Sequence, residues 1–256
     1  MLRTGLFILE EACSQSFDLL SHKILSIPSP KILGLGGTVS LKFDSKTNHE
    51  IVFRGHVIKN DTERSYIEAL IGQFKGMEIT QVLEVGFGLG ISAMSIQTAL
   101  HPKQHDIYEI EANIYVDCSR FCQEHPGSNP HFEDFYTVNY DALCAKYDLF
   151  FDDSYDYNFP LNNIQPRKAD EEVFLQKEFS LTYDDYVKEC FEKSRKIALQ
   201  VLKVGGYYCT IYFGGNPPRL AGFEMVRTET RSEDALRLWD ESVGSNAQVF
   251  YYKKLP

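Results

Sequence analysis

The fold of this chain is decided by the stretch Val82-Leu83-Glu84-Val85-Gly86-Phe87-Gly88-Leu89-Gly90-Ile91-Ser92. An apolar strand that ends in an acid is followed by three alternating glycines and then by the first turn of a helix. Glycine has no Cβ, so it suits sharp turns and close contact with a ligand, and the helix start offers free N–H groups and a positive dipole end. The stretch predicts a strand-loop-helix corner that binds a nucleotide-like ligand. A glycine-rich turn of any doubly wound protein is the alternative.

The spacing of the glycines narrows the class of ligand. A dinucleotide fingerprint needs G-x-G-x-x-G and a phosphate loop needs a lysine behind its glycines, whereas this chain has Glu84-x-Gly86-x-Gly88-x-Gly90 without such a lysine. The pattern resembles motif I of the class I S-adenosylmethionine (SAM) methyltransferases. The resemblance implies that SAM is the cofactor, that the glycine loop passes under it, and that Glu84 helps to hold its methionine portion.

Composition and charge exclude several other classes of function. The 256 residues carry a net charge of -10, which gives no basic surface for a phosphate backbone, so no nucleic-acid partner is expected and a cationic substrate suits the chain better. The six cysteines form no C-x-x-C pair, so no metal site is predicted. The apolar run near the N-terminus is too short for a signal peptide, and no segment reaches the roughly 18 apolar residues of a membrane span. We expect a cytoplasmic protein without a membrane partner.

The hydrophobic pattern predicts an N-terminal addition and one larger domain. Residues 1–58 are expected to form an arm followed by a β-hairpin, with strands at 39–43 and 50–53 around a turn at 44–48. The arm is a possible homodimer contact, and the hairpin could cover a site. Residues 59–256 are expected to form the methyltransferase domain.

Strands alternate with helices in that domain, which indicates a parallel sheet. The expected fold is α/β, a doubly wound and mostly parallel seven-stranded sheet of the Rossmann-like methyltransferase type. Its strands are predicted at 81–85, 106–111, 135–138, 147–151, 207–213, 223–228 and 248–253. Helices are predicted at 61–76, 91–100, 113–125, 183–202 and near 233–239, and an acidic insert at 154–180.

Ligands of such sheets bind at the carboxyl ends of the strands. At the end of the second strand, Glu111 is predicted to bind ribose hydroxyls, with Glu109 as the alternative. After the third, Tyr140 and Asp141 could flank an adenine, although Asp141 could equally be a turn residue. The fourth strand ends in Asp152-Asp153. Two adjacent acids raise each other's pKa unless a cation neutralises them, and because strand side chains alternate, one should face the site and the other away from it.

A closer resemblance indicates which kind of compound accepts the methyl group. The segments Val82–Gly88, Ile110–Asn113, Tyr147–Tyr155 and Val201–Gly206 together look like guanidinoacetate N-methyltransferase and the related arginine-methylating enzymes, over roughly residues 60 to 215. The resemblance implies that Asp153 binds a guanidino group beside the methyl donor and that Glu63 is the second substrate acid. Asp152 is expected to bind the cofactor.

Departures from that family leave the acceptor open. Asn60 stands where the family has a further glutamate, Asp156 replaces a proline, and the insert is long, with Tyr155 and Tyr157 as aromatic walls for a cation. The expected function is SAM-dependent N-methylation of a small cationic guanidino or amino compound, with Asp153 and Glu63 catalytic. The alternatives are methylation of arginine or another side chain in a peptide, and a non-catalytic SAM-binding subunit.

Overall fold

A computed structural model describes residues 44–53, 56–154, 183–210, 219–227 and 250–256. The chain divides into two units, Met1–Gly36 and Gly37–Pro256, and all described residues belong to the second. The predicted arm, the strand at 39–43, the insert at 154–180 beyond Ser154 and the helix near 233–239 lie outside the described residues. The predicted domain boundary after residue 58 stays a prediction.

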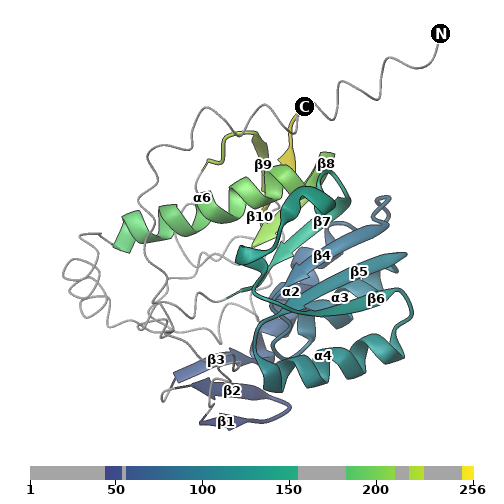
Figure 1. Cartoon of the computed structure of the whole chain (residues 1–256), viewed down its shortest axis with the longest axis vertical. Coiled ribbons are helices and arrows are strands. Elements are labelled where there is room, and N and C mark those ends of the chain that lie inside the picture. Colours follow the sequence, from purple (N-terminus) through teal and green to yellow (C-terminus); the bar gives the residue numbers. More distant parts are fainter. Residues whose placement is uncertain (1–43, 54–55, 155–182, 211–218, 228–249) are drawn as a thin grey trace. The chain divides into compact units, whose positions relative to one another are not determined.

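The centre of the second unit is a seven-stranded sheet (Figure 1). Its order is β6 (Ser128–Phe132), β5 (Gln104–Glu109), β4 (Gln81–Val85), β7 (Tyr147–Asp152), β8 (Leu202–Thr210), β10 (Phe250–Lys254) and β9 (Phe223–Arg227). The first five strands are parallel, and β10 runs antiparallel to both β8 and β9. This is the doubly wound, mostly parallel sheet of the Rossmann-like methyltransferase fold, so the predicted fold class is confirmed.

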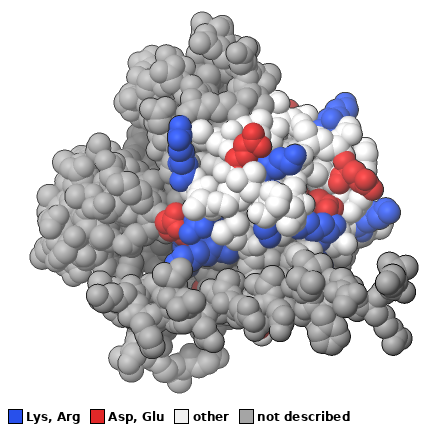
Figure 2. Space-filling model, turned by 90° about the horizontal axis from the view of Figure 1, so that it is seen from above, with Lys and Arg blue, Asp and Glu red and all other residues white. Residues whose placement is uncertain are grey.

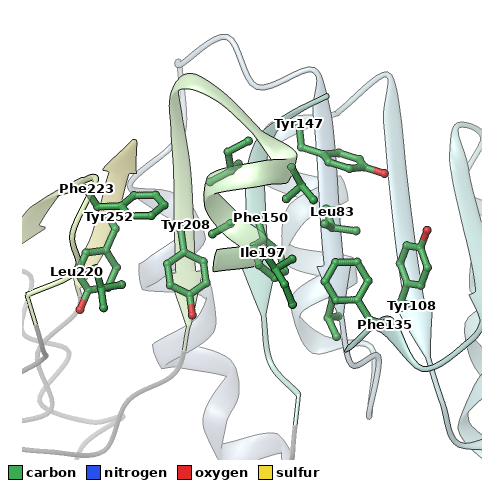
Figure 3. Close-up of a cluster of buried hydrophobic side chains, with 14 residues drawn as sticks. Leu83, Tyr108, Phe135, Tyr147, Phe150, Ile197, Tyr208, Leu220, Phe223 and Tyr252 are labelled. Atoms are coloured by element: carbon green, nitrogen blue, oxygen red, sulfur yellow. The ribbon is translucent and has the colours of Figure 1, made fainter. Parts of the chain in front are cut away.

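Helices cover both faces of this sheet. On one face, α6 (Tyr183–Val201) buries Ile197, Ala198 and Val201 against Phe150 and Tyr208 of the strands. Figure 3 shows the aromatic side chains of that core side by side on neighbouring strands. On the other face lie α2 (Arg64–Gly72), α3 (Ile91–Leu100) and α4 (Ala112–Glu124). Burial of these apolar side chains is the main stabilising contribution, at roughly 25 cal/mol per Å².

A second, smaller sheet precedes α2. It is antiparallel and contains β1 (Ser45–Lys46), β2 (Glu50–Phe53) and β3 (His56–Asn60). The hairpin prediction was partly wrong: Ser45–Lys46 forms a strand where a turn was expected, and β3 was not predicted at all. A 3-10 turn, Asp61–Glu63 (η1), joins β3 directly to α2, so this sheet places Lys59 and Glu63 close to the glycine loop.

The third strand of the parallel sheet was predicted in the wrong place. It is Ser128–Phe132, and the predicted segment is a 3-10 helix, Phe135–Thr137 (η2), in which Phe135 is buried in the core. A second 3-10 helix, Tyr140–Leu143 (η3), follows. β6 pairs only with β5 among the described strands, and an edge strand tolerates Pro130 and polar residues, which erase the apolar pattern. The start of β8 was also wrong, because the expected turn at 203–206 is already strand.

Two carboxylates, the buried Asp106 and the partly buried Asp148, tie the strands together at their amino ends. Asp106 accepts hydrogen bonds from Lys146 (2.8 Å) and from the Tyr147 hydroxyl (2.6 Å). Asp148 accepts from the Thr80 amide (2.9 Å) and from Lys203 (2.6 Å). These contacts join segments that are far apart in sequence, at the end of the sheet opposite to the glycine loop. No helix among the described residues is long and apolar enough to span a membrane.

Candidate functional site

The glycine loop after β4 is shaped by three positive φ angles. Gly86, Gly88 and Gly90 have φ of 87°, 54° and 72°, a region that other residues rarely adopt. A Cβ at Gly86 would lie 2.5 Å from the Asp153 carbonyl oxygen, and one at Gly90 would lie 2.7 Å from the Phe87 ring. The glycines are therefore required both for the turn and for close backbone contact between the loop and the end of β7.

Glu109 fixes this loop to the end of β5. Its carboxylate accepts hydrogen bonds from the Phe87 amide (3.0 Å) and from the Glu111 amide (2.8 Å). Burial raises the pKa of Glu109 against the lowering effect of these amides. Because its oxygens are used by the backbone, Glu109 shapes the loop, and Glu111 is the better candidate to bind a ligand. Glu111 lies two residues after the end of β5 as the N-cap residue of α4, and it is buried.

Glu84 is buried below the loop. One oxygen accepts a hydrogen bond from the Ser92 hydroxyl, and the other lies 2.8 Å from Nε2 of His105. Both side chains of the Glu84–His105 pair are fully buried. The structure thus places Glu84 between β4, β5 and the start of α3, where it braces the loop from beneath. Contact of Glu84 with the methionine portion of a cofactor stays a prediction.

Asp152 and Asp153 face opposite sides of the sheet, as the alternation of strand side chains predicts. Asp152 points toward α6, where its carboxylate accepts hydrogen bonds from the hydroxyls of Tyr136 (3.1 Å), Ser154 (2.6 Å) and Ser194. The Tyr208 hydroxyl donates in turn to Ser194 (2.8 Å). Asp152 is therefore held by protein hydroxyls, while the Asp153 side chain lies on the face of the loop.

The backbone positions Asp153 beside the glycine loop. Its amide donates to the Val85 carbonyl oxygen (2.9 Å), and its carbonyl oxygen contacts Gly86. Burial raises the pKa of Asp153 to about 7; the Lys59 ammonium lowers it, and the Glu63 charge raises it further. A carboxyl group of this pKa gains and loses its proton near neutrality, as a general base must.

Glu63 and Asp153 converge on one cation, although 90 residues of sequence separate them. Lys59 Nζ lies 2.8 Å from Glu63 Oε2 as an ion pair and also donates to Asp153 Oδ2. The three side chains are each 5% exposed. Glu63 is fixed by the Asn60 amide, which donates to its other oxygen (3.1 Å). The lysine stem crosses the loop, because a Cβ at Gly88 would lie 3.4 Å from its Cγ.

A tyrosine hydroxyl without a partner lies near this cluster. Tyr66 is on α2, three residues after Glu63, and its buried hydroxyl has no hydrogen-bond partner among the described residues. Its pKa is raised by burial and by the nearby Cys209 and Asp153. A buried polar group without a partner is costly, so the hydroxyl is a candidate contact for a ligand.

Other predicted site residues lie elsewhere. Tyr140 is in η3, where its hydroxyl donates to the Phe135 carbonyl oxygen. Asp141 accepts from Gln200 (3.4 Å) next to the end of α6, which is the amino end of β8, so the structure does not bring it to the ligand edge. The strand-end acids after β6 are Glu133 and Asp134, and Asp134 caps η2 by accepting from the Tyr136 amide (3.0 Å). Tyr155 and Tyr157 lie outside the described residues.

Sequence reasoning missed Lys59 and Tyr66. The signal for Lys59 was its i, i+4 spacing to Glu63 in a segment that alternates as a strand and then turns into a helix. Tyr66 was visible as the residue one helical turn after Glu63, but nothing in the sequence shows that its hydroxyl is left without a partner.

A cavity of about 440 Å³ opens beside the loop. It is lined by Lys46 of β1, by Thr47 and Asn48 of the β1–β2 turn, by Phe87, Gly88 and Leu89, and by Asp117 and Arg120 of α4. Neither Glu111 nor Asp153 is among the residues that line it. On the face shown in Figure 2, basic and acidic side chains of the described residues are interspersed.

No protein-family model matches the chain, and no curated protein is similar to it in sequence. Solved structures with partial similarity include the 23S rRNA methyltransferase ErmE (TM-score 0.42, 14% identity, 75% of this chain and 68% of that chain). The N-methyltransferase NodS from Bradyrhizobium japonicum WM9 has a TM-score of 0.45 and 12% identity over 77% of this chain and 99% of that chain. The CurJ carbon methyltransferase has a TM-score of 0.45 and 13% identity over 75% and 54%. These likenesses identify neither a family nor an acceptor, and the fold assignment rests on the strand order.

Proposed function

We propose that the protein is a SAM-dependent N-methyltransferase that acts on a small cationic guanidino compound. The observation that carries the proposal is the convergence of Glu63 and Asp153 on a single buried cation beside the glycine loop. Two carboxylates in this arrangement suit a group that carries positive charge and several N–H donors. The methyltransferase-type sheet supports the same reading.

The residues at the carboxyl edge fit SAM as the methyl donor. The three glycines of the loop from Gly86 to Gly90 leave backbone open to a ligand, and a Cβ at Gly88 would lie against the Lys59 stem. Glu111, buried at the start of α4, is in the position where a carboxylate binds ribose hydroxyls. SAM supplies an electrophilic methyl group on a sulfonium. What remains for the protein is to place a nitrogen and to remove the proton that this nitrogen loses.

Asp153 is assigned both tasks. As a carboxylate it aligns a guanidinium through paired hydrogen bonds. With a pKa near 7 it also accepts the proton that leaves the attacking nitrogen. Glu63 holds the rest of the cationic group, and Tyr66 offers a further hydrogen bond. Burial of these groups excludes water and so strengthens each contact.

The test is a transfer assay with labelled SAM and a panel of guanidinoacetate, arginine, agmatine, arginine-containing peptides and matched amines. We expect transfer to at least one small guanidino compound. Transfer to the peptides alone would contradict the small-molecule acceptor and favour methylation of a side chain in a peptide. Bound SAM with no transfer to any member of the panel would contradict the proposal and favour the non-catalytic one.

A further inference from the structure

The acid pair already holds a cation that belongs to the chain itself. The ammonium group of Lys59 contacts Glu63 and Asp153, and the lysine stem lies across Gly88. This is the place that the proposed function gives to the cationic group of the acceptor. Lys59 and an acceptor cation cannot both occupy it.

We propose that Lys59 is a specificity-determining residue that an acceptor must displace, and that it selects guanidino compounds over amines. The inference rests on the proposed function, because it concerns the acceptor of the same site. Lys59 neither binds the methyl donor nor acts as a base. It competes with the acceptor for the two carboxylates.

The competition favours a guanidinium for a geometric reason. A primary amine makes the same kind of contacts as Lys59, but it must compete with a tethered group whose effective concentration is on the order of millimolar or higher. A guanidinium has five donors in a planar fork that pairs with a carboxylate through two hydrogen bonds, which an ammonium group cannot do. Only the guanidinium gains contacts that offset the loss of the Lys59 ion pairs.

The displacement can be observed in the unmodified protein. Lys59 is buried, so acylation of its amine by acetic anhydride, followed by peptide mass spectrometry, should be slow in the free chain. Addition of S-adenosylhomocysteine with agmatine or arginine should raise the rate at Lys59 severalfold and leave Lys203, which pairs with Asp148 far from the loop, unchanged. A Lys59 rate that stays constant while the guanidino compound binds would overturn the inference.

Substitution gives an independent test. Lys59→Met and Lys59→Gln remove the competitor, so amines should bind better, and the preference for the guanidino member of a pair should shrink by about tenfold. The pairs are guanidinoacetate and glycine, arginine and ornithine, and agmatine and putrescine. Lys203→Met is the control and should keep the wild-type preference. An unchanged preference in both folded Lys59 variants would contradict the inference.

The failure of this inference differs from the failure of the proposed function. If the wild-type protein methylates a guanidino compound but neither the labelling nor the preference responds to Lys59, only the inference is wrong. If no compound is methylated, the proposed function is wrong. The labelling then still reports whether a guanidinium displaces Lys59, and constant labelling would overturn the inference as well.

Discussion

Asp153 combines burial, a nearby cation and a fixed backbone position in one residue. Asp153→Asn keeps the size of the side chain but cannot accept a proton, so methyl transfer should fall to background. Binding of SAM, measured by calorimetry, should stay within about threefold of wild type, because the loop is fixed by Glu109 rather than by this carboxylate. Asp117→Asn, at an exposed ion pair, is the control. Unchanged turnover in Asp153→Asn would remove Asp153 from its role.

The raised pKa of Asp153 predicts a pH dependence of turnover. Its pKa is about 7, and only the deprotonated form accepts a proton. The catalytic efficiency for the acceptor, kcat/KM, reports the free enzyme and should therefore rise between roughly pH 6 and pH 8 and level off above that range. For stability the sign is opposite: a raised carboxyl pKa favours the folded state at low pH, and this contribution is lost as pH rises through 7. A flat rate profile across this range would contradict the assignment of the base.

Substitution of Tyr66 shows whether its hydroxyl contacts a ligand or stabilises the fold. Its hydroxyl has no partner among the described residues, so Tyr66→Phe should change the free energy of unfolding by less than about 1 kcal/mol. If the hydroxyl contacts the acceptor, catalytic efficiency should fall by up to about tenfold. Tyr147→Phe, which removes a hydroxyl bonded to Asp106, should show the reverse pattern of lower stability and normal acceptor binding. Equal efficiency in Tyr66→Phe and wild type would exclude the contact.

At the scale of elements, the glycine loop allows a sharp comparison. Gly86→Ala puts a Cβ 2.5 Å from the Asp153 carbonyl oxygen, whereas Gly76→Ala has a similar φ and no atom within 4 Å of the new Cβ. Both substitutions destabilise the folded state by about 1 kcal/mol, because alanine is strained in a left-handed backbone conformation. Only Gly86→Ala also forces the loop to move. We expect SAM affinity, measured by calorimetry, to fall at least about tenfold in Gly86→Ala and to be unchanged in Gly76→Ala. Equal affinities would show that the loop does not hold the donor.

The elements that the sequence predicted well are those with a strong local pattern. The strand Gln81–Val85 and the helix Ile91–Leu100 were placed correctly, because buried apolar runs bounded by glycines are specific signals. The third strand was missed because β6 is polar and contains Pro130, while the apolar run at Phe135 fills the core from a 3-10 helix. Tyr140 and Asp141 were therefore expected at the end of that strand, whereas Glu133 and Asp134 directly follow β6.

At the scale of the whole molecule, the sequence predicted the mostly parallel α/β sheet, but not the ion-pair partners. Asp153 and Glu63 were expected to meet at a ligand, and the structure brings them together on Lys59. Such pairing depends on contacts between β3, α2 and the end of β7, which no local pattern encodes. The contacts of Asp106 also depend on segments far apart in the chain, and the sequence did not predict them.

The Asp106 cluster predicts how the whole fold responds to acid. Burial would raise the pKa of Asp106, but the nearby His131 ring and hydrogen bonds from Lys146, Tyr147 and Gln104 hold it well below its ordinary value. Its contribution to stability is therefore present above about pH 4 and lost as pH falls further. Asp106→Asn should lower the free energy of unfolding by about 3 kcal/mol at pH 7. In urea titrations at a series of pH values, the free energy of unfolding of this variant should decrease less between pH 7 and acid pH than that of the wild type.

The control for this prediction is Asp117→Asn. Asp117 forms ion pairs with Lys46 and with Arg120 (3.1 Å) and is 41% exposed, so its substitution should cost about 1 kcal/mol or less. If both variants lose the same stability, the buried cluster does not tie the strands together as described.

Because Gly86 and Asp153 are in close backbone contact, the glycine loop and Asp153 move together. The loop can move only if the end of β7 moves with it, because the Asp153 amide is bonded to Val85 and its carbonyl lies against Gly86. Under the proposed function, a donor bound to the loop also sets the position of the Asp153 carboxylate, the proposed base. We therefore expect donor binding and acceptor binding to strengthen each other by the same factor.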